Sequence, residues 1–124
     1  MRLFLLLPVL LAGCTSLNTQ SAPDGDLSWL IRSLQDEGVF ILERPHGGSV
    51  APATSSVRLI LNGQESLEVY EFDRLEEAET TARQWSYQLT GKDVYLREQL
   101  VVVRNSRRDT GLSGTLHKLL GSTI

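Results

Sequence analysis

Cysteine and histidine are scarce in this chain, which has one cysteine, Cys14, and two histidines, His46 and His117. A single thiol forms no internal disulfide and supplies no thiolate cluster for a structural metal. Two distant histidines also fall short of the ligand number and spacing of a histidine-based zinc site. We therefore expect neither a metal nor another cofactor, and the fold must be stabilised by packing.

The chain also lacks an excess of basic charge. It has 12 lysines and arginines against 15 aspartates and glutamates, a formal net charge of −3 at pH 7. Binding to nucleic acid depends on basic surfaces that neutralise phosphates, so we expect no nucleic-acid partner. One basic cluster combines Arg104, Arg107 and Arg108, but three charges are fewer than polybasic membrane anchors usually contain. We interpret this cluster as part of a solvated loop.

The apolar run from Leu3 to Leu11 is too short for a transmembrane helix. A membrane span needs about 20 apolar residues, whereas polar residues begin at Thr15, directly after Cys14. A basic start at Arg2 followed by a brief apolar run is typical of a secretory signal segment. Residues 1–13 are therefore predicted to be a signal peptide.

The end of that segment, Leu11-Ala12-Gly13-Cys14, resembles the lipobox of bacterial lipoproteins. The resemblance implies cleavage before Cys14, a diacylglycerol thioether on its thiol and a fatty acid such as palmitate on the freed amine. Ordinary signal peptidase cleavage is the alternative, but it requires no cysteine at this place. Two or three acyl chains would anchor the protein permanently to the membrane of the cell envelope. Thr15 stands where inner-membrane lipoproteins of enteric-type bacteria have aspartate, which favours the outer membrane, facing the periplasm, in a Gram-negative organism.

After the lipidated cysteine, the small polar residues up to position 25 predict a flexible tether, so residues 14–25 join the anchor to a single domain over residues 26–124. The domain begins with a predicted helix. Asp26 is a suitable N-cap, Leu27, Leu30 and Leu34 share one helical face, and a glycine at position 38 ends the pattern. A strand over residues 39–43 follows, and its continuous apolarity predicts an interior position in a sheet.

A hairpin is predicted around Asn62-Gly63, between strands over residues 57–61 and 66–72. A three-residue turn sets Leu59 opposite Leu67 and keeps the apolar residues on one face, whereas a two-residue turn spoils that face. The longer turn also sets Arg58 opposite Glu68 on the other face.

Two further helices and more β structure complete the domain. Asp73 is the expected cap of the second helix, and the third helix buries leucines such as Leu116 and Leu120 before it ends at Gly121. Residues 93–104 are either one long strand or, as we favour, a hairpin turning at residues 97–99 that sets Val94 beside Val102 and Leu96 beside Leu100. The order of elements predicts an α+β two-layer sandwich, with an antiparallel sheet of four to five strands and about three helices. The region from Leu27 to Gly121 is similar to small envelope lipoproteins of bacteria, which implies this architecture and no active site.

The loop from Arg44 to Ser56 is the predicted interaction site, because it is long and carries His46, Gly47 and Gly48. No residue pattern indicates catalysis, and the acidic run over residues 68–79 is interpreted as solvated strand and helix faces. We therefore expect a lipid-anchored, non-catalytic binding or assembly module with a protein partner in the envelope. The alternative is a small envelope enzyme that uses His46 with acidic or arginine side chains.

Overall fold

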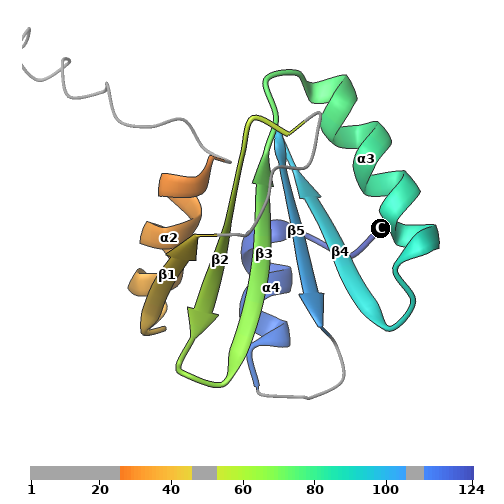
Figure 1. Cartoon of the computed structure of the whole chain (residues 1–124). Coiled ribbons are helices and arrows are strands. Elements are labelled where there is room, and N and C mark those ends of the chain that lie inside the picture. Colours follow the sequence, from red (N-terminus) through yellow and green to blue (C-terminus); the bar gives the residue numbers. More distant parts are fainter. Residues whose placement is uncertain (1–25, 46–52, 106–110) are drawn as a thin grey trace, which may run out of the picture.

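A computed structural model describes residues 26–45, 53–105 and 111–124 of the chain. These residues form a five-stranded antiparallel sheet with strand order β1-β2-β3-β5-β4 and three helices (Figure 1). The elements in chain order are α2 Leu27–Asp36, β1 Ile41–Pro45, β2 Ser55–Leu61, β3 Glu65–Glu71, α3 Leu75–Gln88, β4 Lys92–Arg97, β5 Leu100–Asn105 and α4 Ser113–Leu120. The expected α+β class, antiparallel sheet and helix number are confirmed.

Helices pack on both faces of the sheet, so the predicted two-layer sandwich is wrong and the domain has three layers. Helices α2 and α4 share one core with β2, β3, β4 and β5, where Leu30, Leu59 and Leu116 are fully buried. Helix α3 packs on the opposite face, where Ala78 and Ala82 contact a second apolar cluster from β3, β4 and β5. Because α3 lies over β4 and β5 (Figure 1), the same face of β1 and β2 has no helical cover among the described residues.

Helix α2 forms as predicted, since its signals are local. The backbone N–H of Trp29 donates to the Asp26 carboxylate at 2.8 Å, which satisfies one of the unpaired donors at the helix start. Leu30 and Leu34 on the inner face are fully buried. Gly38 adopts a positive φ of 87°, a backbone conformation in which glycine is favoured and which ends the helix.

The hairpin of β2 and β3 also has the predicted register. Leu59 lies opposite Leu67 and Val57 opposite Val69, both pairs on the face that α2 and α4 cover. Asn62 and Gly63 turn the chain with positive φ values of 52° and 68°. On the other face, the guanidinium of Arg58 lies 3.6 Å from the carboxylate of Glu68.

The β4–β5 segment is a hairpin, but its predicted register is wrong by one residue. Val94 lies opposite Val103 and Leu96 opposite Val101, so these residues share the face under α3. The turn contains two residues instead of three, and its Glu98 adopts a positive φ of 53°. The tight turn is held from outside, because the side-chain amide of Gln99 donates to the carbonyls of Phe72 and Asp73.

Strand β1 is an edge strand, which corrects the predicted interior position. Its neighbour in the sheet is β2 alone, and Phe40 and Leu42 are 69% and 42% exposed. The second helix also differs at its start: the N-cap is Arg74, without a side-chain hydrogen bond, so Asp73 does not cap it. The backbone carbonyl of Asp73 accepts a hydrogen bond from the side-chain amide of Gln99.

Candidate functional site

The predicted interaction residues His46, Gly47 and Gly48 lie outside the described residues, as does the predicted lipidation site Cys14. The ends of the predicted loop belong to strands, because β1 extends to Pro45 and β2 begins at Ser55. The other histidine lies on α4, exposed, with its ring centroid 5.6 Å from that of Tyr95.

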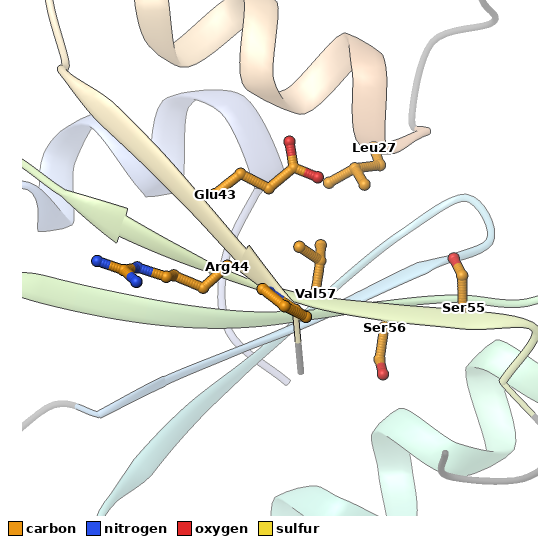
Figure 2. Close-up of a pocket in the computed structure, with 7 residues that line it drawn as sticks. Leu27, Glu43, Arg44, Ser55, Ser56 and Val57 are labelled. Atoms are coloured by element: carbon orange, nitrogen blue, oxygen red, sulfur yellow. The ribbon is translucent and has the colours of Figure 1, made fainter. Parts of the chain in front are cut away.

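An open pocket of about 520 Å³ lies where β1 ends and β2 begins (Figure 2). The side chains of Glu43 and Val57 point toward Leu27 at the start of α2, whereas Ser56 points to the opposite side of the sheet. The full lining consists of Leu27, Glu43, Arg44, Pro45, Ser55, Ser56 and Val57. The pocket thus lies beside the outer end of the edge strand.

The outer side of β1 presents free backbone groups. The carbonyl of Phe40 accepts from the N–H of Asn62 at 2.8 Å, and the N–H of Phe40 donates to the Asn62 side-chain oxygen at 2.8 Å, so Phe40 bonds toward β2. Backbone direction alternates along an antiparallel strand, which turns the N–H and C=O of Ile41 and Glu43 away from β2. No described residue hydrogen-bonds to these outward groups. Within the described residues, these groups are open to another strand.

The opposite edge of the sheet differs from β1. The backbone N–H of Ile124 donates to the carbonyl of Val94 at 2.9 Å, on the side of β4 that faces away from β5. Residues near Ile124 therefore occupy part of that edge. Of the two edge strands, β1 has the more accessible outer side within the described part of the chain.

An apolar patch continues from this edge onto the uncovered face of the sheet. Leu42 lies opposite Ile60, and Phe40 precedes Leu42 by two residues on the same face. Arg44 and Arg58 lie opposite each other at one side of the patch. We call these five residues the β1 surface. A contiguous apolar patch with a charged rim is typical of a protein interaction site.

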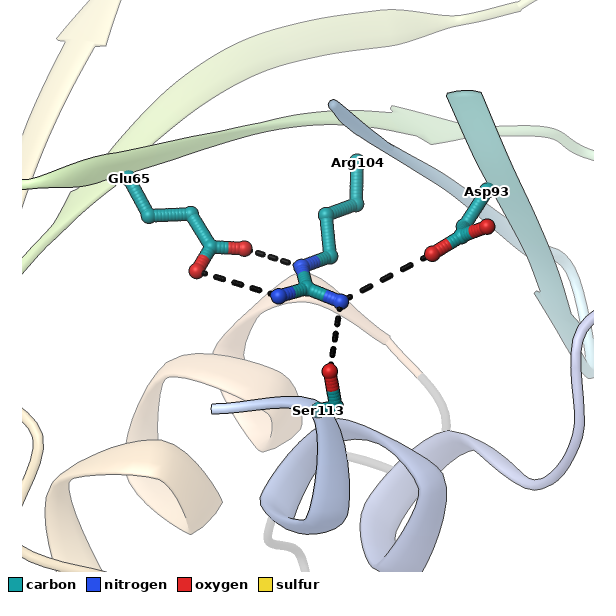
Figure 3. A network of polar contacts seen from close by, with 4 residues as sticks. All are labelled: Glu65, Asp93, Arg104 and Ser113. Carbon is teal, nitrogen blue, oxygen red and sulfur yellow. Dashed lines mark hydrogen bonds and ion pairs between the residues drawn. The ribbon is translucent and has the colours of Figure 1, made fainter. Parts of the chain in front are cut away.

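The basic cluster predicted around Arg104 is wrong for that residue, which is buried with 3% of its surface exposed. Its guanidinium pairs with Glu65, donates to the Ser113 hydroxyl at 2.9 Å and lies 3.6 Å from Asp93 (Figure 3). The hydrogen bond to Glu65 raises the pKa of Arg104. This network joins β3, β4, β5 and α4, so its role is structural. Arg107 and Arg108 lie outside the described residues.

Part of the acidic run also has structural partners instead of a solvated face. The Glu71 carboxylate accepts from the N–H of Leu27 at 3.0 Å and from the Ser55 hydroxyl at 2.8 Å, which ties the start of α2 to β3 and β2. The Glu68 carboxylate accepts from the hydroxyl of Tyr70 at 3.1 Å and pairs with Arg58. Such bonding explains these two acids without a ligand.

Sequence reasoning missed the β1 surface because it took the apolar run over residues 39–42 as a sign of burial. A signal for an edge was present in Pro45, since proline within a sheet is confined to edges, strand starts and bulges.

None of the described helices has the length and apolarity that crossing a membrane requires. In the same part of the chain, no three His, Cys, Asp or Glu side chains are placed to hold a metal ion.

No protein-family model, curated protein or solved structure matches the chain.

Proposed function

We propose that this chain is a lipid-anchored protein of the cell envelope and acts as a non-catalytic binding module that docks a protein strand on β1. The observation that supports the proposal is the free edge of β1 beside an exposed apolar patch. An open edge templates pairing with other chains, and although β1 carries Glu43, Arg44 and Pro45, no described residue bonds to its outward backbone groups. Keeping Phe40 and Leu42 exposed beside free backbone groups fits binding by strand addition.

Strand addition divides recognition between the backbone and the side chains. The outward N–H and C=O groups of Ile41 and Glu43 would bond to the backbone of the added strand, whatever its sequence. Side chains of that strand would meet Phe40 and Leu42 on one face, and Glu43 beside the pocket on the other. Such a strand contributes the side chains of alternate residues to each of these two faces.

The membrane anchor proposed at Cys14 gives this binding its location. The lipobox-like sequence Leu11-Ala12-Gly13-Cys14 supports lipidation, and a tether up to position 25 would hold the domain near the headgroups. A binding surface held close to a membrane meets other membrane-associated proteins at a raised local concentration. We place the protein on the outer membrane, facing the periplasm, if the organism is Gram-negative.

Site-specific photocrosslinking in intact cells tests the docking site. A photoreactive phenylalanine analogue at position 40 should form a discrete protein adduct, whereas the same analogue at Tyr87, which is exposed on α3, should form none. Phe40→Ser should remove an adduct made from position 42, and Leu75→Ser, a matched exposed apolar residue, should leave it. Equal adducts at positions 40 and 87 would contradict the proposed site.

A further inference from the structure

We infer that the strand added to β1 is the β1 of a second copy of the same chain, paired antiparallel across a two-fold axis. The two five-stranded sheets would then form one continuous sheet. The inference rests on the proposed binding role of the β1 edge and names the partner. It comes from three properties of β1: its free backbone groups, its charges and its exposed side chains.

The free backbone groups restrict the register of such a pair. Pro45 has no N–H, and the N–H of Val39 already donates to the carbonyl of Leu34 at 3.0 Å. Ile41 and Glu43 are therefore the residues that offer both a donor and an acceptor on the outer side. Every one of these groups is satisfied when Ile41 lies opposite Glu43 of the second copy, and the reverse pair follows by symmetry.

The charges and the backbone of β1 disfavour the neighbouring registers. Sliding the second strand by two residues in one direction sets Glu43 opposite Glu43 of the second copy. Sliding it by two more residues sets Arg44 opposite Arg44. Like charges directly opposite each other destabilise a strand pair. A shift in the other direction sets Glu43 opposite Val39, whose N–H is already used. The register with Ile41 opposite Glu43 of the second copy thus satisfies the outward backbone groups without placing like charges opposite each other.

In that register the exposed side chains of β1 cover one another. Leu42 lies opposite Leu42 of the second copy, and Phe40 lies opposite Arg44 of the second copy. Both are non-hydrogen-bonded pairs, in which side chains approach most closely. An arginine guanidinium over an aromatic ring gains a cation–π attraction. The apolar side chains that are exposed on a single chain, Phe40 at 69% and Leu42 at 42%, therefore gain Arg44 and Leu42 of the second copy as partners.

The pairing surface is small, so association should depend on concentration at the membrane. A short strand pair buries less area than stable soluble dimers do. Confinement by the proposed lipid anchor raises the effective concentration of the two copies without any new contact. The test therefore uses the full chain in its own membranes.

Cysteine crosslinking under mild oxidation tests the register. The non-hydrogen-bonded pair brings the two Cα atoms at position 42 to a spacing of about 4.5 Å, within the range of a disulfide. Leu42→Cys should give a disulfide-linked dimer in membranes, whereas Leu75→Cys, an exposed apolar residue on α3, should not. Phe40→Cys and Arg44→Cys should each stay monomeric, and coexpression of these two variants should give a mixed dimer.

A backbone variant separates pairing from folding. Glu43→Pro removes an outward N–H without touching the bonds between β1 and β2, so circular dichroism should remain unchanged. In the Leu42→Cys background, this substitution should lower the dimer yield by at least about tenfold, because one backbone hydrogen bond is lost on each side of the axis. An unchanged yield would overturn the inference.

The outcomes distinguish this inference from the proposed function. A dimer at position 42 but not at position 75 supports it, and equal dimer yields at both positions overturn it. If position 42 stays monomeric while the photoreactive group at position 40 captures a different protein, the second copy is excluded and the proposed docking function stands. If neither crosslink forms, both proposals fail.

Discussion

At the residue scale, Arg104 is a charged side chain that is buried because its neighbours Glu65, Asp93 and Ser113 supply oxygen partners for its guanidinium. Its carboxylate partner Glu65 is almost equally buried. Replacing Arg104 with methionine leaves that carboxylate without its cation, which we expect to lower the free energy of unfolding by about 3–5 kcal/mol. Urea denaturation measures this loss.

A double replacement provides the control for the Arg104 prediction. Arg104→Met with Glu65→Leu removes both charges, and we expect it to recover most of the lost stability. Arg58→Met breaks an exposed ion pair and should cost less than about 1 kcal/mol. Equal effects of Arg104→Met and Arg58→Met would show that the buried network contributes little.

Two buried tyrosines predict a loss of stability in alkaline solution. Burial raises the pKa of Tyr70, and the neighbouring Glu68 raises it further; burial also raises the pKa of Tyr95. An unfolded tyrosine ionises near pH 10, so above that pH the unfolded chain binds fewer protons than the folded chain. The contribution of these tyrosines to the free energy of unfolding is therefore fully present below about pH 10. It falls as pH rises further, by up to about 1.4 kcal/mol per pH unit for each tyrosine.

Thermal melts between pH 8 and pH 11 test the tyrosine prediction. Tyr70→Phe should flatten the alkaline decline, because phenylalanine has no proton to lose. The ring should keep its edge contact with Trp85, where the tyrosine ring centroid now lies 4.7 Å away. A decline that is unchanged in this variant would assign the alkaline loss to other groups.

At the element scale, the structure separates patterns that are local from those that depend on distant contacts. Helix α2 and the β2–β3 hairpin were predictable because their signals, the Asp26 cap and the Asn62-Gly63 turn, lie within the elements themselves. The β4–β5 register was not, because its tight turn depends on contacts between Gln99 and the distant Phe72.

The candidate site was missed for a related reason. An apolar strand is buried on both sides only if helices cover both, and the sequence does not show that α3 covers β4 and β5 but not β1. The loop residues around His46, which did attract attention, lie outside the described residues, so that prediction stays untested. Local sequence patterns thus predict helices and strands, but they do not show which face of a strand stays exposed.

The turn of the β4–β5 hairpin gives a prediction at this scale. Glu98 has a positive φ of 53°, a conformation that costs a residue with a Cβ about 1 kcal/mol or more. Glu98→Gly should therefore raise the melting temperature by a few degrees. Gln99→Ala, which removes the ties to the Phe72 and Asp73 carbonyls, should lower it. A lower melting temperature for Glu98→Gly would show that the turn is not strained.

At the scale of the whole molecule, the proposed anchor and the described domain should be separable. Cys14→Ser should abolish acylation and release the protein from the membrane, whereas the domain over residues 26–124 should keep its circular dichroism spectrum. Carbonate extraction and intact mass measure the two effects. Retention of the serine variant in washed membranes, together with an unacylated native protein, would contradict the lipoprotein proposal.

The difference between the two edges of the sheet would limit how far the proposed assembly can proceed. A molecule with two open edges could add copies without end and grow into a fibre, whereas one open edge and an isologous contact close the assembly after a single pairing. In the proposed assembly, the hydrogen bond from Ile124 to Val94 would hinder growth at the second edge, because it occupies part of that edge. Polymerisation would become accessible if that contact were lost.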